Sequence, residues 1–154
     1  AWPDSATGLY DAVAATGGAD HTFSMTWGDA GGAGDEVSIS AVEVRGAVAI
    51  EDESWVERDG DTSITSASVT TSGPAMLVAW WWGSGGVRPP GTMHTAMPGD
   101  GFTALPGASG LTSLSSNGYI QVAAAYRSVD TAGTYTVSWT TEGEGAQLYL
   151  IALR

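Results

Sequence analysis

Three consecutive tryptophans, Trp80, Trp81 and Trp82, close an apolar run that begins at Met76. Successive side chains of a β-strand point to opposite faces, so an extended run would divide its rings between two sides. One face would carry Met76, Val78, Trp80 and Trp82, and the other Leu77, Ala79 and Trp81. Neither face is polar. The strand must therefore be covered twice, by the interior of its own sheet on one side and by a loop, another subunit or a ligand on the other.

The length and composition suit a single domain over residues 1–154. The chain has no cysteine, which excludes disulfides, thiolate nucleophiles and cysteine-ligated zinc but leaves the redox compartment open. No stretch approaches the roughly 20 apolar residues of a membrane helix, so we expect no membrane insertion. The chain begins Ala1-Trp2-Pro3 without an initiator methionine, and we therefore expect a processed product or a segment of a longer protein.

The charge balance excludes one class of partner. Seventeen acidic residues stand against five arginines and no lysine, for a net charge of −12. Nucleic-acid binding relies on clustered Lys and Arg that neutralise phosphates, and a chain of this charge would repel a polyanion. We therefore predict no nucleic-acid partner and no attachment to an anionic membrane.

Short segments of alternating apolar and polar residues, separated by Gly, Ser and Thr, run along the chain. They predict an all-β fold, which we expect to be one antiparallel two-sheet β-sandwich, jelly-roll-like, with about eight strands. The predicted strands are residues 21–27, 37–45, 47–51, 64–70, 76–82, 119–127, 134–140 and 146–153. Residues 83–118 form the longest irregular region, which is typical of a functional, mobile or partner-bound loop. Residues 9–15 could instead form a short helical turn.

The sequence gives little support for catalysis. The chain has two histidines as candidate bases, His21 on the apolar face of a predicted strand and His94 in the irregular region without a nucleophile elbow. The carboxylates between Glu51 and Asp61 could supply a glycosidase pair. An acidic loop on a chain of this charge is more often solvated surface. We therefore predict that the protein is not an enzyme, and a small hydrolase is the least favoured alternative.

The same acidic loop offers oxygen ligands for a hard cation. Calcium takes roughly six to eight oxygens, and Asp59 and Asp61 flank the flexible Gly60, with Glu57 close by. The spacing lacks the full D-x-[DN]-x-[DN]-G pattern. We predict no obligatory cofactor, with calcium held by Asp59, Asp61 and Glu57 as the candidate metal site.

The tryptophans form the third group of candidates. Trp27 and Trp139 alternate with polar residues, which predicts that both rings lie in the core. Exposed aromatic rings can stack on sugars, whereas buried ones fill cores and subunit interfaces. The candidate interface or glycan-binding residues are Trp80, Trp81, Trp82, Trp55 and Trp2. For the three contiguous rings, packing in a core or an interface is the favoured interpretation.

Residues 64–154 resemble a loose group of β-sandwich modules from tailed-phage virion structural proteins and secreted bacterial surface proteins. The resemblance is carried by the segments TTSGPAMLVA (70–79), GFT (101–103), VAAAYRSV (122–129), AGTYTVSW (132–139) and LIAL (150–153). That group repeats a GDLLVA strand, a GWT or GFT turn, an AYR strand and a YTxTW strand in this order. Two departures are the triple tryptophan, which extends the first strand, and Phe102 where the turn usually has tryptophan.

The resemblance implies a non-catalytic structural or attachment module, located on a virion or secreted outside the cell. We expect it to self-associate through the aromatic strand face, as a homo-oligomer or with other virion or surface proteins. The alternative is a carbohydrate-binding module of a secreted enzyme, with Trp2, Trp55 or Trp81 as the platform for a glycan.

Overall fold

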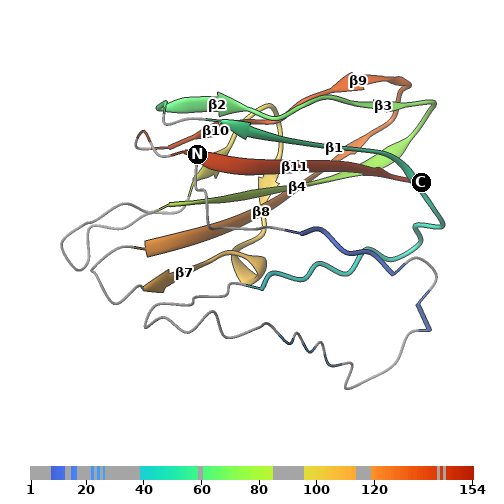
Figure 1. The fold of residues 1–154 in the computed structure, drawn as a ribbon. Helices are drawn as coiled ribbons and strands as arrows, with labels where there is room; N and C mark the ends of the chain where they lie inside the picture. The colour runs from blue at the N-terminus through green and yellow to red at the C-terminus, as the bar shows by residue number, and fades with distance from the viewer. Residues whose placement is uncertain are drawn as a thin grey trace.

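The computed structural model describes residues 8–12, 15–16, 22, 24, 26, 39–58, 61–84, 96–113, 119–141, 143 and 145–154 (Figure 1). This part of the chain is all-β with antiparallel sheets, as predicted, and contains no α-helix. No helix within it is long and apolar enough to cross a membrane.

Six strands form the large sheet. Their central path runs β1 (Ile50–Arg58), β11 (Ala146–Leu153), β4 (Ala75–Ser84) and β8 (Tyr119–Val129). The outer edge of β8 pairs with two short strands, β6 (Thr103–Ala104) and β7 (Gly110–Ser113), which are separated by the 3-10 turn Pro106–Ala108. The strands predicted at residues 76–82, 119–127 and 146–153 are confirmed as β4, β8 and β11, because each contains an uninterrupted apolar run that two neighbouring strands can cover.

Five shorter strands lie over one face of the large sheet (Figure 1). They are β2 (Ser63–Thr65), β3 (Val69–Thr71), β5 (Met97–Pro98), β9 (Gly133–Tyr135) and β10 (Ser138–Thr140). Strand β10 pairs with β2 and β5, and β3 pairs with β9.

A bulge divides two of the predicted strands. Residues 66–68 face residues 136–137, so three residues oppose two and the ladder is interrupted. The gap is bridged by Ser66, whose N–H donates to the Val137 carbonyl at 2.9 Å, while its Oγ accepts from the Val137 N–H at 3.0 Å. Predicted strands 64–70 and 134–140 are therefore each present as two short strands.

The core lies between the large sheet and the short strands. Trp81 and Trp139 are its largest fully buried side chains, and Trp139 is thereby confirmed as a core residue. The large sheet contributes Leu77, Ala79, Trp81, Ala123, Ala125, Leu148, Leu150 and Ala152, and the short strands contribute Ile64, Val69 and Trp139. Gly83 is required here, because a Cβ at that position would lie 2.6 Å from the Trp81 ring.

The short motifs behind the resemblance meet at one corner of the fold. Asp100 and Gly101 both have positive φ in a turn closed by the Phe102 N–H on the Gly99 carbonyl. Arg127 donates to the Asp100 carbonyl at 2.8 Å and lies 5.6 Å above the Tyr135 ring. The Asp100 carboxylate in turn accepts from the Ser138 N–H at 2.6 Å. These motif residues therefore hold loops and strands together.

Several strand predictions were wrong. Of the strand predicted at 37–45, the described residues 39–45 lie outside any strand. The strand expected at 47–51 begins at Ile50 and continues to Arg58 because it pairs with β11 along its whole length. The irregular region 83–118 contains β5, β6 and β7, which were too short to show a period. Of the remaining predictions, the described residues of 9–15 are not helical, and Thr22, Ser24 and Thr26 lie outside any strand.

Candidate functional site

The large sheet has a second face, on the side away from the short strands. We call it the aromatic face, because the described residues place five aromatic side chains on it: Trp55, Trp80, Trp82, Tyr126 and Tyr149. Trp80 and Trp82 lie on this face and Trp81 lies on the other, so the predicted alternation of the three tryptophans is confirmed.

Three of these rings form one row across three strands. Trp55 on β1 is the register partner of Tyr149 on β11, which is also the partner of Trp80 on β4. The Trp55 and Tyr149 rings stack with centroids 6.4 Å apart and planes 25° apart. The register partner of Trp80 on β8 is Ala124, whose small side chain leaves room for the indole. We call Trp55, Tyr149 and Trp80 the aromatic row.

The centre of the aromatic face is already covered within one chain. Val78 is 1% exposed, and Ala124 and Ile151 are also buried. Figure 1 shows residues 39–49 passing beneath the large sheet on this side. Ser40 anchors that segment through a 2.6 Å hydrogen bond from its Oγ to the Ala108 carbonyl. The sequence left open whether a loop, another subunit or a ligand covers this face. A segment of the same chain covers part of it.

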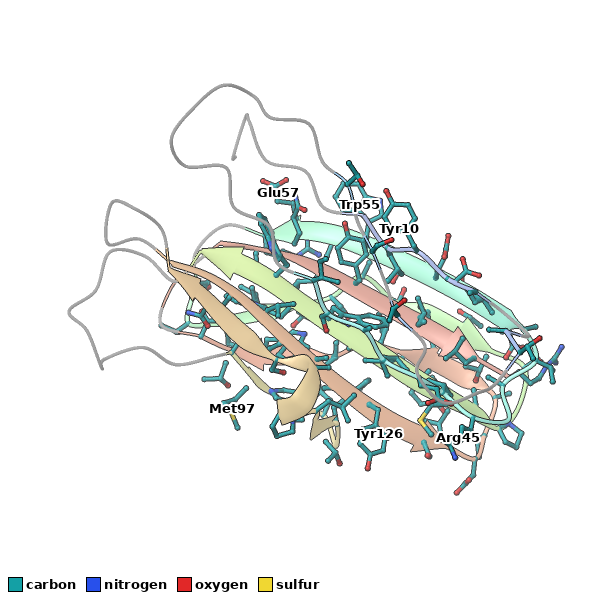
Figure 2. The ribbon with its side chains drawn as sticks, turned by 90° about the horizontal axis from the view of Figure 1, so that it is seen from below. Tyr10, Arg45, Trp55, Glu57, Met97 and Tyr126 are labelled. Carbon is teal, nitrogen blue, oxygen red and sulfur yellow. The ribbon has the colours of Figure 1, made fainter. Side chains whose placement is uncertain are left out.

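The β1 end of the row is open. Trp55 is 62% exposed and borders a depression of about 490 Å³. The depression is lined by Gly8, Leu9, Glu53, Ser54, Trp55, Gln147 and Tyr149. Tyr10, which is 88% exposed, lies on the same side of the sheet as Trp55 in Figure 2. A flat aromatic ring beside amide and carboxylate groups can both stack on a ligand and exchange hydrogen bonds with it.

Two carboxylates flank the exposed indole. Glu53 and Glu57 lie two residues on either side of Trp55 in β1, so all three side chains leave the strand on the same face, and all three are exposed. Figure 2 shows Glu57 and Trp55 projecting from this edge of the sheet. The acidic segment that we predicted to be a loop is therefore mainly a strand.

The structure excludes one of the candidate glycan platforms. Trp81 is 0% exposed, because its ring packs in the core over Gly83, and it cannot serve as a glycan platform or an interface residue. Trp80 and Trp82 are half-buried and Trp55 is exposed. Trp2 and Trp27 lie outside the described residues.

The predicted calcium site is only partly within the described chain. Asp59 lies outside it, Glu57 belongs to β1, and Asp61 lies in the turn before β2, where its carboxylate accepts from the Thr62 N–H at 2.7 Å. Among the described residues, no three Asp, Glu or His side chains are arranged to hold a metal ion. Calcium binding stays a prediction.

Glu51 is held at the start of β1. Its Oε1 accepts from both the hydroxyl and the N–H of Ser72, and Arg154 Nη1 lies 3.7 Å away. The Ser72 hydrogen bonds, aided by Arg154, lower the pKa of Glu51 below its usual value of 4.5. A general acid needs the opposite shift, so Glu51 does not suit that role, and its contacts tie the start of β1 to Ser72 and Arg154. His21 and His94 lie outside the described residues.

The sequence missed Tyr149, Glu53 and Tyr10 as members of the site. Tyr149 was detectable as the residue whose side chain alternates away from Leu148 and Leu150 in the last strand. Comparisons of the chain with protein-family models, with curated proteins and with solved structures found no match.

Proposed function

We propose that this chain is a non-catalytic attachment module, displayed on a virion or secreted, that contacts a glycan through the aromatic row. The observation that carries the proposal is the exposed Trp55 ring stacked on Tyr149 beside a depression. The resemblance of residues 64–154 to phage and surface modules supports the setting.

We also propose that the fold is a jelly-roll-like β-sandwich. Its pairings are nested: β1 pairs with β11, the β2–β3 segment with β9–β10, and β4 with β8. Rolling one long antiparallel ribbon into two layers produces this nesting. The shared core between the large sheet and the short strands supports the two-layer interpretation.

Glycan contact explains why Trp55 is exposed. An exposed indole contributes little to the stability of the fold. Trp55 is nevertheless held nearly parallel to the neighbouring Tyr149 ring. Sugar rings present flat C–H faces that match such a surface, while their hydroxyls match the nearby carboxylate and amide groups. The large apolar area of the indole would then be covered only when ligand is bound.

A glycan array followed by titration calorimetry tests the proposal. The wild type should bind at least one oligosaccharide, and Trp55→Ala should weaken that binding at least tenfold. Met97→Ala is the matched control, because Met97 is a similarly exposed apolar side chain (57%) on β5 (Figure 2). An array without signal, or equal loss in both variants with unchanged melting, would contradict the proposal.

Self-association is the second candidate function. It is favoured by the half-buried Trp80 and Trp82, which leave apolar area on the aromatic face of a single chain. A symmetric homo-oligomer would cover that area. Native mass spectrometry should then show a discrete oligomer that Trp80→Ser dissociates, whereas a strict monomer would exclude this candidate.

A further inference from the structure

We infer that the glycan is built from amino sugars with free, protonated amino groups, rather than from neutral or acidic sugars. The inference rests on the proposed function and specifies the ligand class of the same site. It comes from the charges around the aromatic row.

Carboxylates approach the exposed indole from both directions along β1. Glu53 and Glu57 are each two residues from Trp55, which places them about 7 Å from it along the strand. A sugar ring stacked on Trp55 would therefore lie between two acidic side chains. The net charge of −12 adds a long-range field that concentrates cations and repels anions near this surface.

The aromatic rings favour the same ligand. A cation over the face of tryptophan is attracted by the electron density of the ring, and the exposed Trp55 ring offers such a face. An ammonium group on the sugar can thus contact a ring and a carboxylate at once. A neutral hydroxyl or N-acetyl group lacks the positive charge on which both of these contacts depend.

Acidic sugars lack a partner in the described part of the chain. Arg45 pairs with Glu43 at 3.1 Å, and Arg58 donates to the Thr65 carbonyl on the side of β2. Arg127 and Arg154 are held at the Asp100 turn and at Ser72. None of these four arginines lines the depression beside Trp55, so a carboxylated or sulfated sugar would meet Glu53 without a compensating cation.

Three hexamers separate the ligand classes: glucosamine, N-acetylglucosamine and galacturonate, titrated at mildly acidic pH where the free amines are protonated. At low salt the glucosamine hexamer should bind about fivefold tighter than its acetylated counterpart, as one exposed ion pair and one cation–π contact allow. Raising the salt to about 0.5 M should remove most of that difference by screening. Galacturonate should not bind.

Glu53→Gln should lower the ratio of the two affinities at least twofold, because it removes the ion pair and leaves the cation–π contact. Asp130→Asn is the matched control, since it removes the same charge from an exposed position beyond the end of β8, three strands away from β1, and should leave the ratio unchanged. Equal affinity of the wild type for both hexamers, or preference for galacturonate, would overturn this inference while the proposed function stands. Absence of binding to any glycan would overturn both.

Discussion

The two faces of the large sheet are both apolar, yet they differ in how they are covered. On the core face, Trp81 and its neighbours are covered by the short strands, and among the described residues no exposed aromatic ring lies there. On the aromatic face, the centre is buried while Trp55 on β1 and Tyr126 on β8 remain exposed on either side of it (Figure 2). The two apolar faces of β4 therefore differ in role: the buried face stabilises the fold, and the partly open face is available for contact.

The largest expected effect comes from the core face. Trp81→Ala should lower the free energy of unfolding by about 3–5 kcal/mol, because it leaves a cavity in the core. Urea denaturation measures this change, with Trp81→Phe as the milder variant. A loss below about 1 kcal/mol would mean that the ring is not packed in the core.

A smaller effect of opposite sign is expected at Gln121. Its side chain is fully buried on the core face, and neither amide atom has a hydrogen-bond partner among the described residues. Gln121→Met keeps the volume and removes the unpaired polar atoms, so it should stabilise the protein by about 1 kcal/mol. Thermal unfolding of the two proteins tests this, and a clear destabilisation would show that the amide is hydrogen-bonded.

The Glu51 contact gives a pH-dependent prediction at the sheet edge. Because its folded-state pKa is lowered, Glu51 contributes stability above about pH 4.5, and that contribution is lost as the pH falls through the folded-state value. Glu51→Gln should therefore flatten the loss of stability between pH 7 and about pH 3. Glu43→Gln, at an exposed ion pair, is the control; identical pH profiles in Glu51→Gln and the wild type would contradict the role of Ser72.

The smallest effect on stability is expected on the aromatic face. Trp55→Ala should change the free energy of unfolding by no more than about 0.5 kcal/mol, because the side chain is mostly exposed. The same denaturation experiment as for Trp81→Ala measures it. A loss comparable to that of Trp81→Ala would make Trp55 a structural residue and remove the contrast between the faces.

The sequence predicted those parts of the fold that one segment specifies alone. Strands β4, β8 and β11 were recognised from their own apolar runs, and alternation correctly separated Trp81 from Trp80 and Trp82. Alternation could not say which face was the core, since both were apolar. That choice is made by the short strands, whose Trp139 and Val69 pack against Trp81's side of the sheet.

The site was harder to predict because its residues come together only through pairing. We interpreted most of β1 as an acidic loop, because its carboxylates conceal the alternation of its side chains. That alternation places Trp55 and Val56 on opposite faces of the sheet. Only the register with β11 aligns Trp55 with Tyr149, and no local pattern contains that register. The same charges suit an edge strand, where they oppose pairing with another chain.

The most direct test of the contrast between the two faces is an NMR titration that follows the indole Nε1–H signals while the glucosamine hexamer is added. The signals of Trp55, assigned through Trp55→Phe, should shift in a saturable manner, and those of Trp81 and Trp139 should stay unchanged. Shifts confined to Trp81 or Trp139, or no change at Trp55 at saturating hexamer, would contradict the account.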